Sequence, residues 1–364
     1  MKKIIFVLLL TNSLTIFAQT TEQQLKLQKI LDKTVDNKLI YGATVNITGE
    51  GVSWQGASGN LDVNSAYFIA SITKLYTTAL VMQLRAEGKL QLNDKISKYL
   101  PEEIMRGLHV YKGIDYSDSI TIRHLLSQTS GLQDYFLGAQ PSGKSLYEEL
   151  VDGNDKSWTF EECITLAKTM PPAFKPGEKG KALYGDTNFQ LLGKIIALIY
   201  NKPIQEVLQE KIFNPLKLKN TYLYHDATDK KPETMYFKTD TLPIPLAMTS
   251  FGPDGGIVSN TAESMIFLKA FFDGTLFPKS YLEEMYQWNP VMYPLEYGVG
   301  LMRFKLPAIF TFGNKIPAYY GHSGLSGAFA FYCPEKNLFF TGTVNQIHKP
   351  GTSFKLMVKL MSAL

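Results

Sequence analysis

The sequence predicts an α/β protein of the α+β type, in which strands from both chain ends form one antiparallel sheet with a mostly helical region inserted between them. Alternating segments at 42–48 and 51–58 are joined by a Gly-Glu-Gly turn and predict a β-hairpin. Four more strand patterns lie near the C-terminus, at 297–304, 318–322, 327–333 and 338–344. We therefore expect a sheet region of about 21–120 and 291–364, and an inserted helical region of about 121–290.

Helical periodicity predicts the other elements. One helix is expected over about 21–37, before the hairpin, and a last one over about 353–364. From Ser71 to Gly88 the apolar residues recur at the spacing of one helix face, and the pattern stops at the glycine. Two further helices are expected at 188–200 and 261–272.

The first 18 residues have the features of a secretory signal peptide. Lys2 and Lys3 precede an apolar run from Ile4 to Leu10, and Ala18 provides a small residue at the expected cleavage point. This run is about half as long as a bilayer span requires, so a retained membrane anchor is the less favoured interpretation. We expect an exported protein, periplasmic or secreted, whose single domain covers 19–364.

Charge, histidine spacing and cysteine content exclude several function classes. Without Lys2 and Lys3 the net charge falls from +4 to +2, because 35 basic residues then face 33 acidic ones, and no basic cluster predicts nucleic-acid binding. The five histidines lack the paired spacing of a zinc site, so we expect neither a metal nor an organic cofactor. Cys163 and Cys333 allow one disulfide after export, but two buried free thiols are the favoured expectation.

The segment Ser71-Ile72-Thr73-Lys74 is the first candidate for chemistry. Positions i and i+3 share a helix face, so the Lys74 amine can lie beside the Ser71 hydroxyl. A serine hydroxyl needs a neighbouring base before it attacks a carbonyl, and a helix N-terminus favours the developing alkoxide. Ser71 is the only serine with a lysine three residues later. A surface Ser/Lys pair on an amphipathic helix is the competing interpretation.

Tyr184-Gly185-Asp186 is a second candidate, although Tyr-x-Asp also occurs at Tyr116 and Tyr224. Tyr184 is favoured because it follows a Lys-Pro-Gly turn and precedes a helix, and loops held by rigid flanks often carry catalytic groups. Its phenol has an ordinary pKa of about 10, so it could act as a base only if a cation such as Lys74 lowered that pKa.

His322-Ser323-Gly324 is the third candidate, at the end of a predicted strand, and it is the only His-x-Gly in the chain. An edge strand beside a nucleophile can supply a backbone N–H to an oxyanion hole, and a glycine permits close approach of substrate. A turn glycine next to an incidental histidine is the competing interpretation.

Five segments occur in the order seen in the serine β-lactamase and penicillin-binding-protein superfamily: 68–74, 122–132, 184–188, 255–259 and 321–324. Over about residues 25–362 the chain resembles the class C branch, which also holds D-aminopeptidases and family VIII esterases. The resemblance implies a β-lactamase/transpeptidase-like fold with the active site between the sheet and the helical region. It also implies that Ser71 is the nucleophile, Lys74 its amine partner and Tyr184 the general base, and that the backbone N–H groups of Ser71 and Leu325, which follows Gly324, form the oxyanion hole.

Two departures from the β-lactamase pattern bear on substrate binding. His322 stands where β-lactamases of this branch have the lysine of Lys-Thr-Gly, and Asp186 stands where they have asparagine. An unperturbed histidine is mostly neutral at pH 7.5, and a carboxylate replaces an amide donor with a charged acceptor. Both changes predict weak binding of a substrate carboxylate, unless another cation such as Arg123 or Lys181 reaches the site.

These residues favour an exported serine hydrolase that acts through an acyl-enzyme on a small ester, amide or peptide, of the esterase or D-amino-acid peptidase type. A β-lactamase or a DD-peptidase acting on cell-wall peptides is the alternative that the missing lysine disfavours. A non-catalytic binding protein with the same fold is the alternative from another class. An α/β-hydrolase is disfavoured because the sequence contains no Gly-x-Ser-x-Gly. The sequence specifies no oligomeric state.

Overall fold

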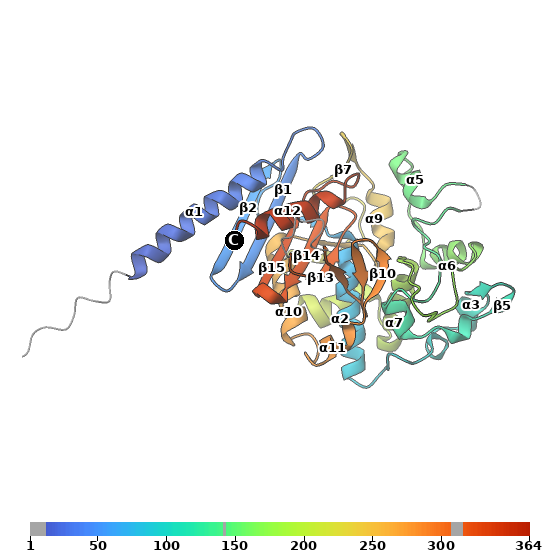
Figure 1. Cartoon of the computed structure of the whole chain (residues 1–364). Helices are drawn as coiled ribbons and strands as arrows, with labels where there is room; N and C mark the ends of the chain where they lie inside the picture. Colours follow the sequence, from blue (N-terminus) through green and yellow to red (C-terminus); the bar gives the residue numbers. More distant parts are fainter. Residues whose placement is uncertain (1–11, 141–142, 307–315) are drawn as a thin grey trace, which may run out of the picture.

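The computed structural model describes residues 12–140, 143–306 and 316–364, and it confirms the predicted fold class. Within these residues the main element is an antiparallel sheet of eight strands (Figure 1). The strands, in spatial order, are β10 (Asn289–Met292), β11 (Leu295–Tyr297), β12 (Met302–Phe304), β13 (Tyr319–Ser323), β14 (Ala328–Cys333), β15 (Leu338–Thr343), β1 (Gly42–Gly49) and β2 (Val52–Gly59).

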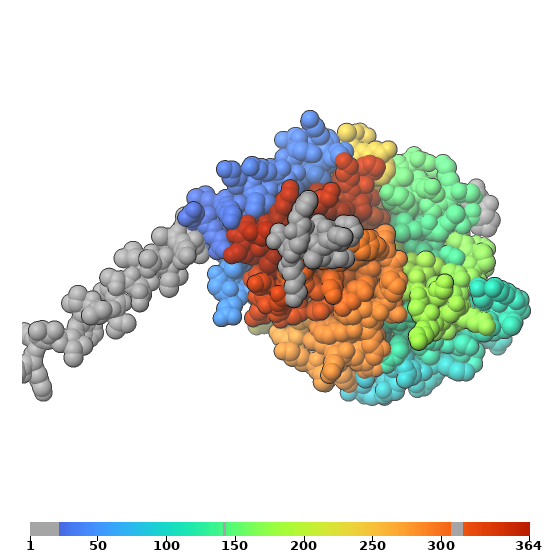
Figure 2. Space-filling model, in the orientation of Figure 1, coloured from blue at the N-terminus to red at the C-terminus, as the bar shows by residue number. Residues whose placement is uncertain are grey.

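The two chain ends meet inside this sheet, where β15 pairs with β1. Val45 lies opposite Gly342, and the pairing runs from Thr44 to Gly49. Figure 2 shows the C-terminal segments, in red, directly beside the N-terminal ones, in blue. The N-terminal hairpin of β1 and β2 therefore joins the sheet only by pairing with β15, a strand almost 300 residues later in the chain.

Helices cover both faces of the sheet. α1 (Asn12–Asp32) and α12 (Gly351–Met361) pack together against β2 and β14, and α10 (Thr261–Asp273) packs against β1, β14 and β15 on the other face (Figure 1). α2 (Thr73–Ala86) lies between the sheet and the helical region and contacts both β13 and α7 (Thr187–Tyr200). Almost every side chain of α2 is buried, so this helix forms the centre of the core.

The remaining elements lie mostly between the two sheet-forming segments of the chain. The other helices are η1 (Ala70–Ile72), η2 (Ile96–Lys98), α3 (Glu102–Met105), η3 (Ser117–Ser119), α4 (Ile122–Leu126), α5 (Leu146–Val151), α6 (Phe160–Thr169), α8 (Ile204–Leu208), η4 (Gln209–Phe213), α9 (Pro245–Phe251), α11 (Tyr281–Met285) and η6 (Pro334–Lys336). In the smaller sheets, β9 (Ile257–Ser259) pairs with both β3 (Tyr67–Phe68) and β6 (Tyr222–Leu223), β4 (Val110–Tyr111) pairs with β5 (Ile114–Asp115), and β7 (Met235–Phe237) pairs with β8 (Asp240–Leu242).

Most of the predicted elements are confirmed, including the hairpin of β1 and β2, the helices α7 and α10, and the strands β13 to β15. The helix predicted over 21–37 is wrong at its end, because α1 stops at Asp32. The Asp36 carboxylate accepts hydrogen bonds from the backbone N–H groups of Lys38, Leu39 and Ile40, at 2.8 to 2.9 Å, and so favours a turn over further helix.

The single strand predicted over 297–304 is also wrong, since β11 and β12 are two strands of a hairpin. Gly298 donates to the carbonyl of Leu301, and Gly300, with φ of +84°, donates to the carbonyl of Leu126 in α4. The Thr78 hydroxyl of α2 in turn donates to the carbonyl of Gly300 at 3.0 Å. These bonds replace strand pairing at the turn and attach the hairpin to the helices beneath it.

The two cysteines are free and buried, Cys163 in α6 and Cys333 at the end of β14, as predicted. The predicted signal peptide, 1–18, lies largely outside the described residues, which begin at Asn12. No helix in the part of the chain that the structure describes is long and apolar enough to cross a bilayer.

The turn between β11 and β12 predicts different costs for two glycine substitutions. In Gly300→Ala the new Cβ would lie 2.3 Å from the Thr78 methyl group, whereas in Gly88→Ala, at a similar positive φ, it would meet open space. A left-handed alanine should lower the free energy of unfolding of both variants by roughly 1–2 kcal/mol. Overpacking against Thr78 should lower that of Gly300→Ala by roughly 1–3 kcal/mol more. Urea unfolding measures the difference. Equal midpoints and equal m-values in the two variants would contradict this packing.

Candidate active site

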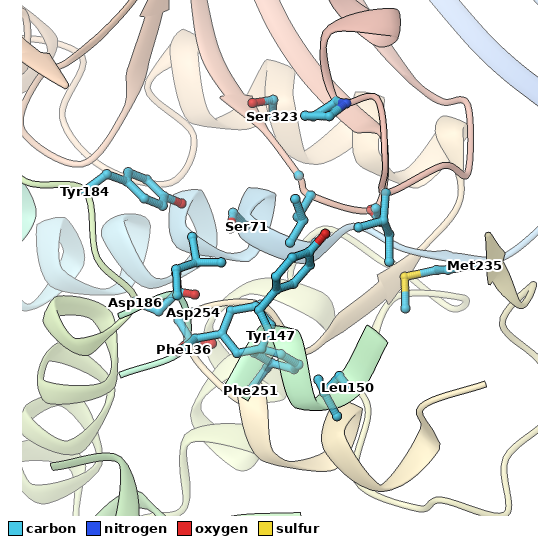
Figure 3. A pocket seen from close by; sticks show the side chains of 18 of the residues that line it. Ser71, Phe136, Tyr147, Leu150, Tyr184, Asp186, Met235, Phe251, Asp254 and Ser323 are labelled. Atoms are coloured by element: carbon cyan, nitrogen blue, oxygen red, sulfur yellow. The ribbon is translucent and has the colours of Figure 1, made fainter. Parts of the chain in front are cut away.

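A cavity of about 370 Å³ opens between the β13 end of the sheet and the helical region. Ser71, Tyr184, Asp186 and Asp254 line one part of it, and Ser323 lies across the cavity from them (Figure 3). The remaining wall is mainly apolar and comes from several separate elements: Phe136, Leu137, Tyr147, Leu150, Val151, Met235, Leu242, Ile244, Met248, Phe251, Val291, Met292, Leu295, Met302, Leu325 and Ile347. The cavity therefore places a small polar group of residues beside a large apolar surface.

Ser71 lies at the start of a helix, as predicted. It belongs to η1, which leads directly into α2, and the strand before it is fixed because Phe68 pairs with Val258 of β9. The preceding residue, Ala70, has φ of +47°, in the left-handed region that non-glycine residues rarely adopt. Backbone strain of this kind concentrates at functional sites. Here it turns the chain sharply between β3 and the helix that carries Ser71.

The Lys74 amine lies beside the Ser71 hydroxyl, which confirms the geometry expected from their spacing. Nζ is 3.0 Å from Ser71 Oγ and 2.7 Å from the carbonyl oxygen of Asp254, and its ion pair with Asp186 Oδ1 measures 2.5 Å. The side chain is fully buried, so the interpretation as a surface Ser/Lys pair is wrong. Burial lowers the pKa of Lys74, but Asp186 and Asp254 more than offset that effect, and the net shift raises the pKa.

Tyr184 also reaches Ser71. Its phenol shares a hydrogen bond with Ser71, and Figure 3 shows the hydroxyl directed toward that residue. Burial raises the pKa of Tyr184 well above its ordinary value, repulsion from Asp186 adds to this, and the hydrogen bond to Ser71 lowers the pKa only in part. The condition under which the Tyr184 phenol could act as a base, a pKa lowered by Lys74, is therefore not met, because Asp186 neutralises the lysine charge.

The conformation around Tyr184 is held by the segment that follows α4. Gln128 Oε1 accepts from the backbone N–H of Gly185 at 3.0 Å and from the Asn188 amide at 2.6 Å. Ser130 donates its hydroxyl proton to Asn188 Oδ1, also at 2.6 Å. Residues 122–132 and 184–188, which the sequence singled out separately, are thus one hydrogen-bonded unit. Tyr116 and Tyr224, the other Tyr-x-Asp tyrosines, do not line the cavity.

Two further aspartates, which sequence reasoning missed, lie beside the Lys74–Asp186 pair. Asp254 Oδ2 accepts from the Tyr135 hydroxyl and the Gln190 amide, each at 3.0 Å. Asp134 Oδ1 accepts from the backbone N–H groups of Phe136 and Asp186, at 3.1 and 3.2 Å. Burial, with repulsion from Asp186, raises the pKa of Asp134 to about 7 and raises the pKa of Asp254 well above its ordinary value. The position of Asp254 directly before Gly255-Gly256 was the one available sequence signal.

Gly324 brings the turn between β13 and β14 against the chain that precedes Ser71. A Cβ on Gly324 would lie 2.3 Å from the carbonyl oxygen of Ile69, and the Ser326 hydroxyl donates to the carbonyl of Phe68 at 2.7 Å. Among the described residues, the backbone N–H groups of Ser71 and Leu325 donate to no protein acceptor. Two unpaired donors therefore lie on neighbouring segments beside the cavity, which is the arrangement an oxyanion hole requires.

His322 lies behind the cavity wall and does not line it, so the expectation that its ring meets substrate has no support in the geometry. Nδ1 donates to the carbonyl of Ser323 at 2.7 Å, and Nε2 accepts from the Tyr297 hydroxyl at 3.2 Å. The His322 and Tyr184 rings pack 6.1 Å apart. Burial and the nearby charge of Lys74 lower the pKa of His322 to about 3. His322 is thus a neutral residue that supports Tyr184.

No lysine or arginine lines the cavity in the part of the chain that the structure describes. Arg123, one of the two cations that could have replaced the missing lysine, is ion-paired with Glu284, and Lys181 lies outside the cavity wall. The carboxyl side chains on the wall are those of Asp186 and Asp254. Within the described residues, no group of three or more histidine, cysteine or acidic side chains is arranged to hold a metal ion.

Comparisons with known proteins place the chain among hydrolases of one family. A family model described as Beta-lactamase matches residues 27–356. A putative D-alanyl-D-alanine carboxypeptidase of Escherichia coli (strain K12) is 28% identical over 191 residues, which cover 51% of this chain and 41% of that protein. The chain spans about two fifths of the length of such curated relatives.

Solved structures match over nearly the whole chain. A D-stereospecific amidohydrolase from Streptomyces sp. is 26% identical, with a TM-score of 0.74 and coverage of 91% of this chain and 97% of that one. The D-amino acid amidase from Ochrobactrum anthropi SV3 is 21% identical, with a TM-score of 0.77 and coverage of 93% and 100%.

The environment of His322 predicts that it stays neutral, with its proton on Nδ1, between about pH 4.5 and 8, whereas an ordinary histidine titrates near pH 6.5. Its pKa is lower in the folded than in the unfolded chain. As pH falls below about 6.5, the unfolded chain therefore binds a proton that the folded chain does not, and stability decreases. Long-range ¹H–¹⁵N NMR of the imidazole, assigned with His322→Gln, measures the titration. A midpoint between pH 5 and 8 would contradict this environment.

Proposed function

The chain belongs to the beta-lactamase family, and we propose that it is a serine hydrolase that forms an acyl-enzyme on Ser71. The observation that carries this proposal is the buried Lys74 amine, 3.0 Å from the Ser71 hydroxyl at the wall of an open cavity. Burying a charged lysine costs free energy, and a hydroxyl on a cavity wall contributes little packing in return. The buried pair is explained if Ser71 is a nucleophile, because a serine must lose its proton to a neighbouring group when it attacks a carbonyl.

In the proposed reaction, Ser71 Oγ attacks the carbonyl carbon of the substrate, and the carbonyl oxygen becomes an oxyanion. The backbone N–H groups of Ser71 and Leu325 donate to that oxyanion. The serine proton leaves through the Lys74 and Tyr184 side chains that contact the hydroxyl. Collapse of the tetrahedral intermediate breaks the bond to the alcohol or amine, which takes up a proton. Water then attacks the acyl-enzyme by the same route and releases the acid.

The cavity supports a substrate with an apolar acyl group and no carboxylate near the reacting carbonyl. Its wall is mainly aliphatic and aromatic, and the carboxyl groups of Asp186 and Asp254 also lie on it. A cavity of about 370 Å³ holds a small ligand, and apolar lining favours binding through buried hydrophobic area. An anionic substrate would lose its hydration without gaining a cationic partner.

Both ester and amide substrates are compatible with this chemistry. The 26% identical relative of solved structure is named a D-stereospecific amidohydrolase, which supports an amide with a D-configured apolar group. The second candidate function is a DD-peptidase acting on cell-wall peptides, which the E. coli relative favours by its name. The lack of a cation on the described cavity wall disfavours it, because such peptides end in a carboxylate. Residues 1–18 support export of the enzyme.

The first prediction from this function is covalent labelling of Ser71. A fluorophosphonate should add one adduct, found by intact-mass spectrometry and mapped to the peptide that contains Ser71. Ser71→Ala should take up no label and should lose turnover by about 10⁴-fold or more, since nucleophile and base act as a unit. The matched control is Ser323→Ala, which changes the serine across the cavity. If Ser71→Ala were still labelled and Ser323→Ala were not, Ser323 would be the nucleophile and the assignment to Ser71 would be wrong.

A second prediction concerns the apolar wall. For p-nitrophenyl esters from acetate to hexanoate, kcat/KM should rise by about fourfold for each methylene, because each buried methylene contributes about 0.8 kcal/mol. Nitrocefin, which carries a carboxylate, should have a kcat/KM at least about tenfold below that of the butyrate ester.

A charge placed at the cavity wall tests the electrostatic part of this prediction. Leu137→Lys adds a cation there, and Leu198→Lys adds one to an equally exposed leucine outside the cavity. The first change should raise nitrocefin turnover relative to ester turnover several-fold, and the second should leave the ratio unchanged. Wild-type nitrocefin hydrolysis as fast as that of the esters would refute the electrostatic argument.

A further inference from the structure

We infer that Asp186 is a positioning residue that takes up a proton from Lys74 while Ser71 attacks its substrate. The inference rests on the proposed function and concerns how the serine proton leaves. It starts from the ion pair between Lys74 Nζ and Asp186 Oδ1, 2.5 Å long, in which the side-chain exposure is 0% for the lysine and 9% for the aspartate.

Lys74 as it stands cannot accept the serine proton. An ammonium group has three N–H donors and no lone pair. Nζ donates hydrogen bonds to Ser71 Oγ and to the carbonyl oxygen of Asp254, and its charge is balanced by the ion pair with Asp186 Oδ1, an oxygen that has no other hydrogen-bond partner. Lys74 is therefore held as an ammonium ion, and it can accept a proton from Ser71 only if it gives one away at the same time.

The carbonyl of Asp254 cannot serve as that acceptor, because a backbone carbonyl is a very weak base. Tyr184 cannot take the proton from Lys74 as a phenolate, because its phenol keeps its own proton. Burial and Asp186 raise the pKa of Tyr184 well above its ordinary value. Of the three groups that Nζ contacts, the Asp186 side chain is the only carboxylate, and a carboxylate is a stronger base than a backbone carbonyl or an alcohol oxygen.

The other two aspartates of the cluster are occupied elsewhere. Asp254 Oδ2 is held by Tyr135 and Gln190, and its contact with Lys74 is made by the backbone carbonyl, not by the carboxylate. Asp134 Oδ1 is held by two backbone N–H groups, one of them that of Asp186 itself. Asp134 thereby fixes the backbone of Asp186 at the start of α7, and neither carboxylate makes an ion pair with Lys74.

The proposed step balances in protons and electrons. As Ser71 Oγ forms its bond to the carbonyl carbon, its proton moves to Lys74 Nζ, and one proton of Nζ moves to Asp186 Oδ1. Lys74 remains an ammonium ion, Asp186 becomes a carboxylic acid, and the negative charge of Asp186 is transferred to the substrate oxyanion. When the intermediate collapses, the proton returns from Asp186 through Lys74 to the leaving alcohol or amine.

The titratable groups that face Lys74 are Asp134, Asp186, Asp254, Tyr184, Tyr297 and His322. Burial alone lowers the pKa of Lys74, and the opposing contributions come from Asp186, Asp254 and Tyr297. Asp186 gives the largest of them, and of the three it is the one that forms an ion pair with the amine. Replacing Asp186 by asparagine should therefore lower the pKa of Lys74 and leave a free amine at moderately alkaline pH.

The experiment compares kcat/KM for p-nitrophenyl butyrate in the wild type, Asp186→Asn and Asp186→Glu between about pH 6 and 10. Asp186→Asn should lose about 10²-fold or more at pH 7, the typical contribution of proton transfer, and should recover as pH rises and Lys74 becomes a free base. Asp186→Glu keeps a carboxylate and should retain more activity at pH 7 without the alkaline recovery.

Glu284→Gln is the control for loss of a partly buried ion pair. It removes the carboxylate that pairs with Arg85 and Arg123, away from the cavity. This variant should be less stable than the wild type while its pH profile keeps the same shape. Asp186→Asn activity within about threefold of the wild type at pH 7, or a deficit that is equal at every pH, would overturn the role of Asp186.

Thermal unfolding provides a readout that does not depend on turnover. In the wild type the pKa of folded Lys74 is raised, so its contribution to stability is constant below about pH 10.5. In Asp186→Asn the folded chain should release this proton earlier than the unfolded chain does, so its stability should rise with pH. The Tm difference between the two proteins should therefore shrink from pH 7 to 10, and a constant difference would refute the ion pair.

The two proposals fail in different ways. A wild-type protein that neither hydrolyses esters or amides nor takes up fluorophosphonate at Ser71 overturns the proposed function and, with it, the proton transfer. A wild-type protein that is active and labelled, together with an unimpaired Asp186→Asn, overturns only the inference on Asp186.

Discussion

A lysine ammonium group buried in the centre of the protein is the constraint on which the site depends. Lys74 lies on α2, whose side chains are almost all inaccessible to solvent. Moving such a charge out of water costs several kcal/mol unless acceptors surround it. The acceptors come from three separate parts of the chain: Ser71 one turn earlier, Asp186 at the start of α7, and the carbonyl of Asp254 before β9. Satisfying one charge thus fixes three segments relative to one another.

The same charge sets the protonation of its neighbours. Three aspartates converge on one lysine, and burial together with repulsion from Asp186 raises the pKa values of Asp134 and Asp254, because the Lys74 charge offsets these effects only in part. Burial, with a smaller contribution from the Lys74 charge, lowers the pKa of His322 to about 3 and keeps the ring neutral. Tyr184 receives no net help from Lys74, because the lysine is paired with Asp186. The protonation states of the groups around Lys74 therefore depend on the Lys74–Asp186 ion pair as a unit.

Around this polar centre the cavity is neutral or acidic and mainly apolar. The sheet contributes the turn after β13, where Gly324 and Ser326 bring the Leu325 N–H close to Ser71. The helical region contributes aromatic and aliphatic side chains such as Phe136 and Leu150. Because the described wall has no lysine or arginine, binding in this cavity depends on apolar contact and on the oxyanion. Both parts of the fold are needed to form it.

The amino-acid sequence by itself determined the fold class, most of the strands and helices, and the pairing of Ser71 with Lys74. These features depend on local periodicity and on spacing along one helix, which a sequence displays directly. It did not determine the break between β11 and β12, because hydrogen bonds to Met285 and Leu126 from distant elements end the strand there. It also could not choose among Tyr116, Tyr184 and Tyr224, or reveal that Asp186 pairs with Lys74 and that His322 turns away from the cavity. Only the tertiary structure decided these, because burial and charge pairing arise between residues far apart in the chain.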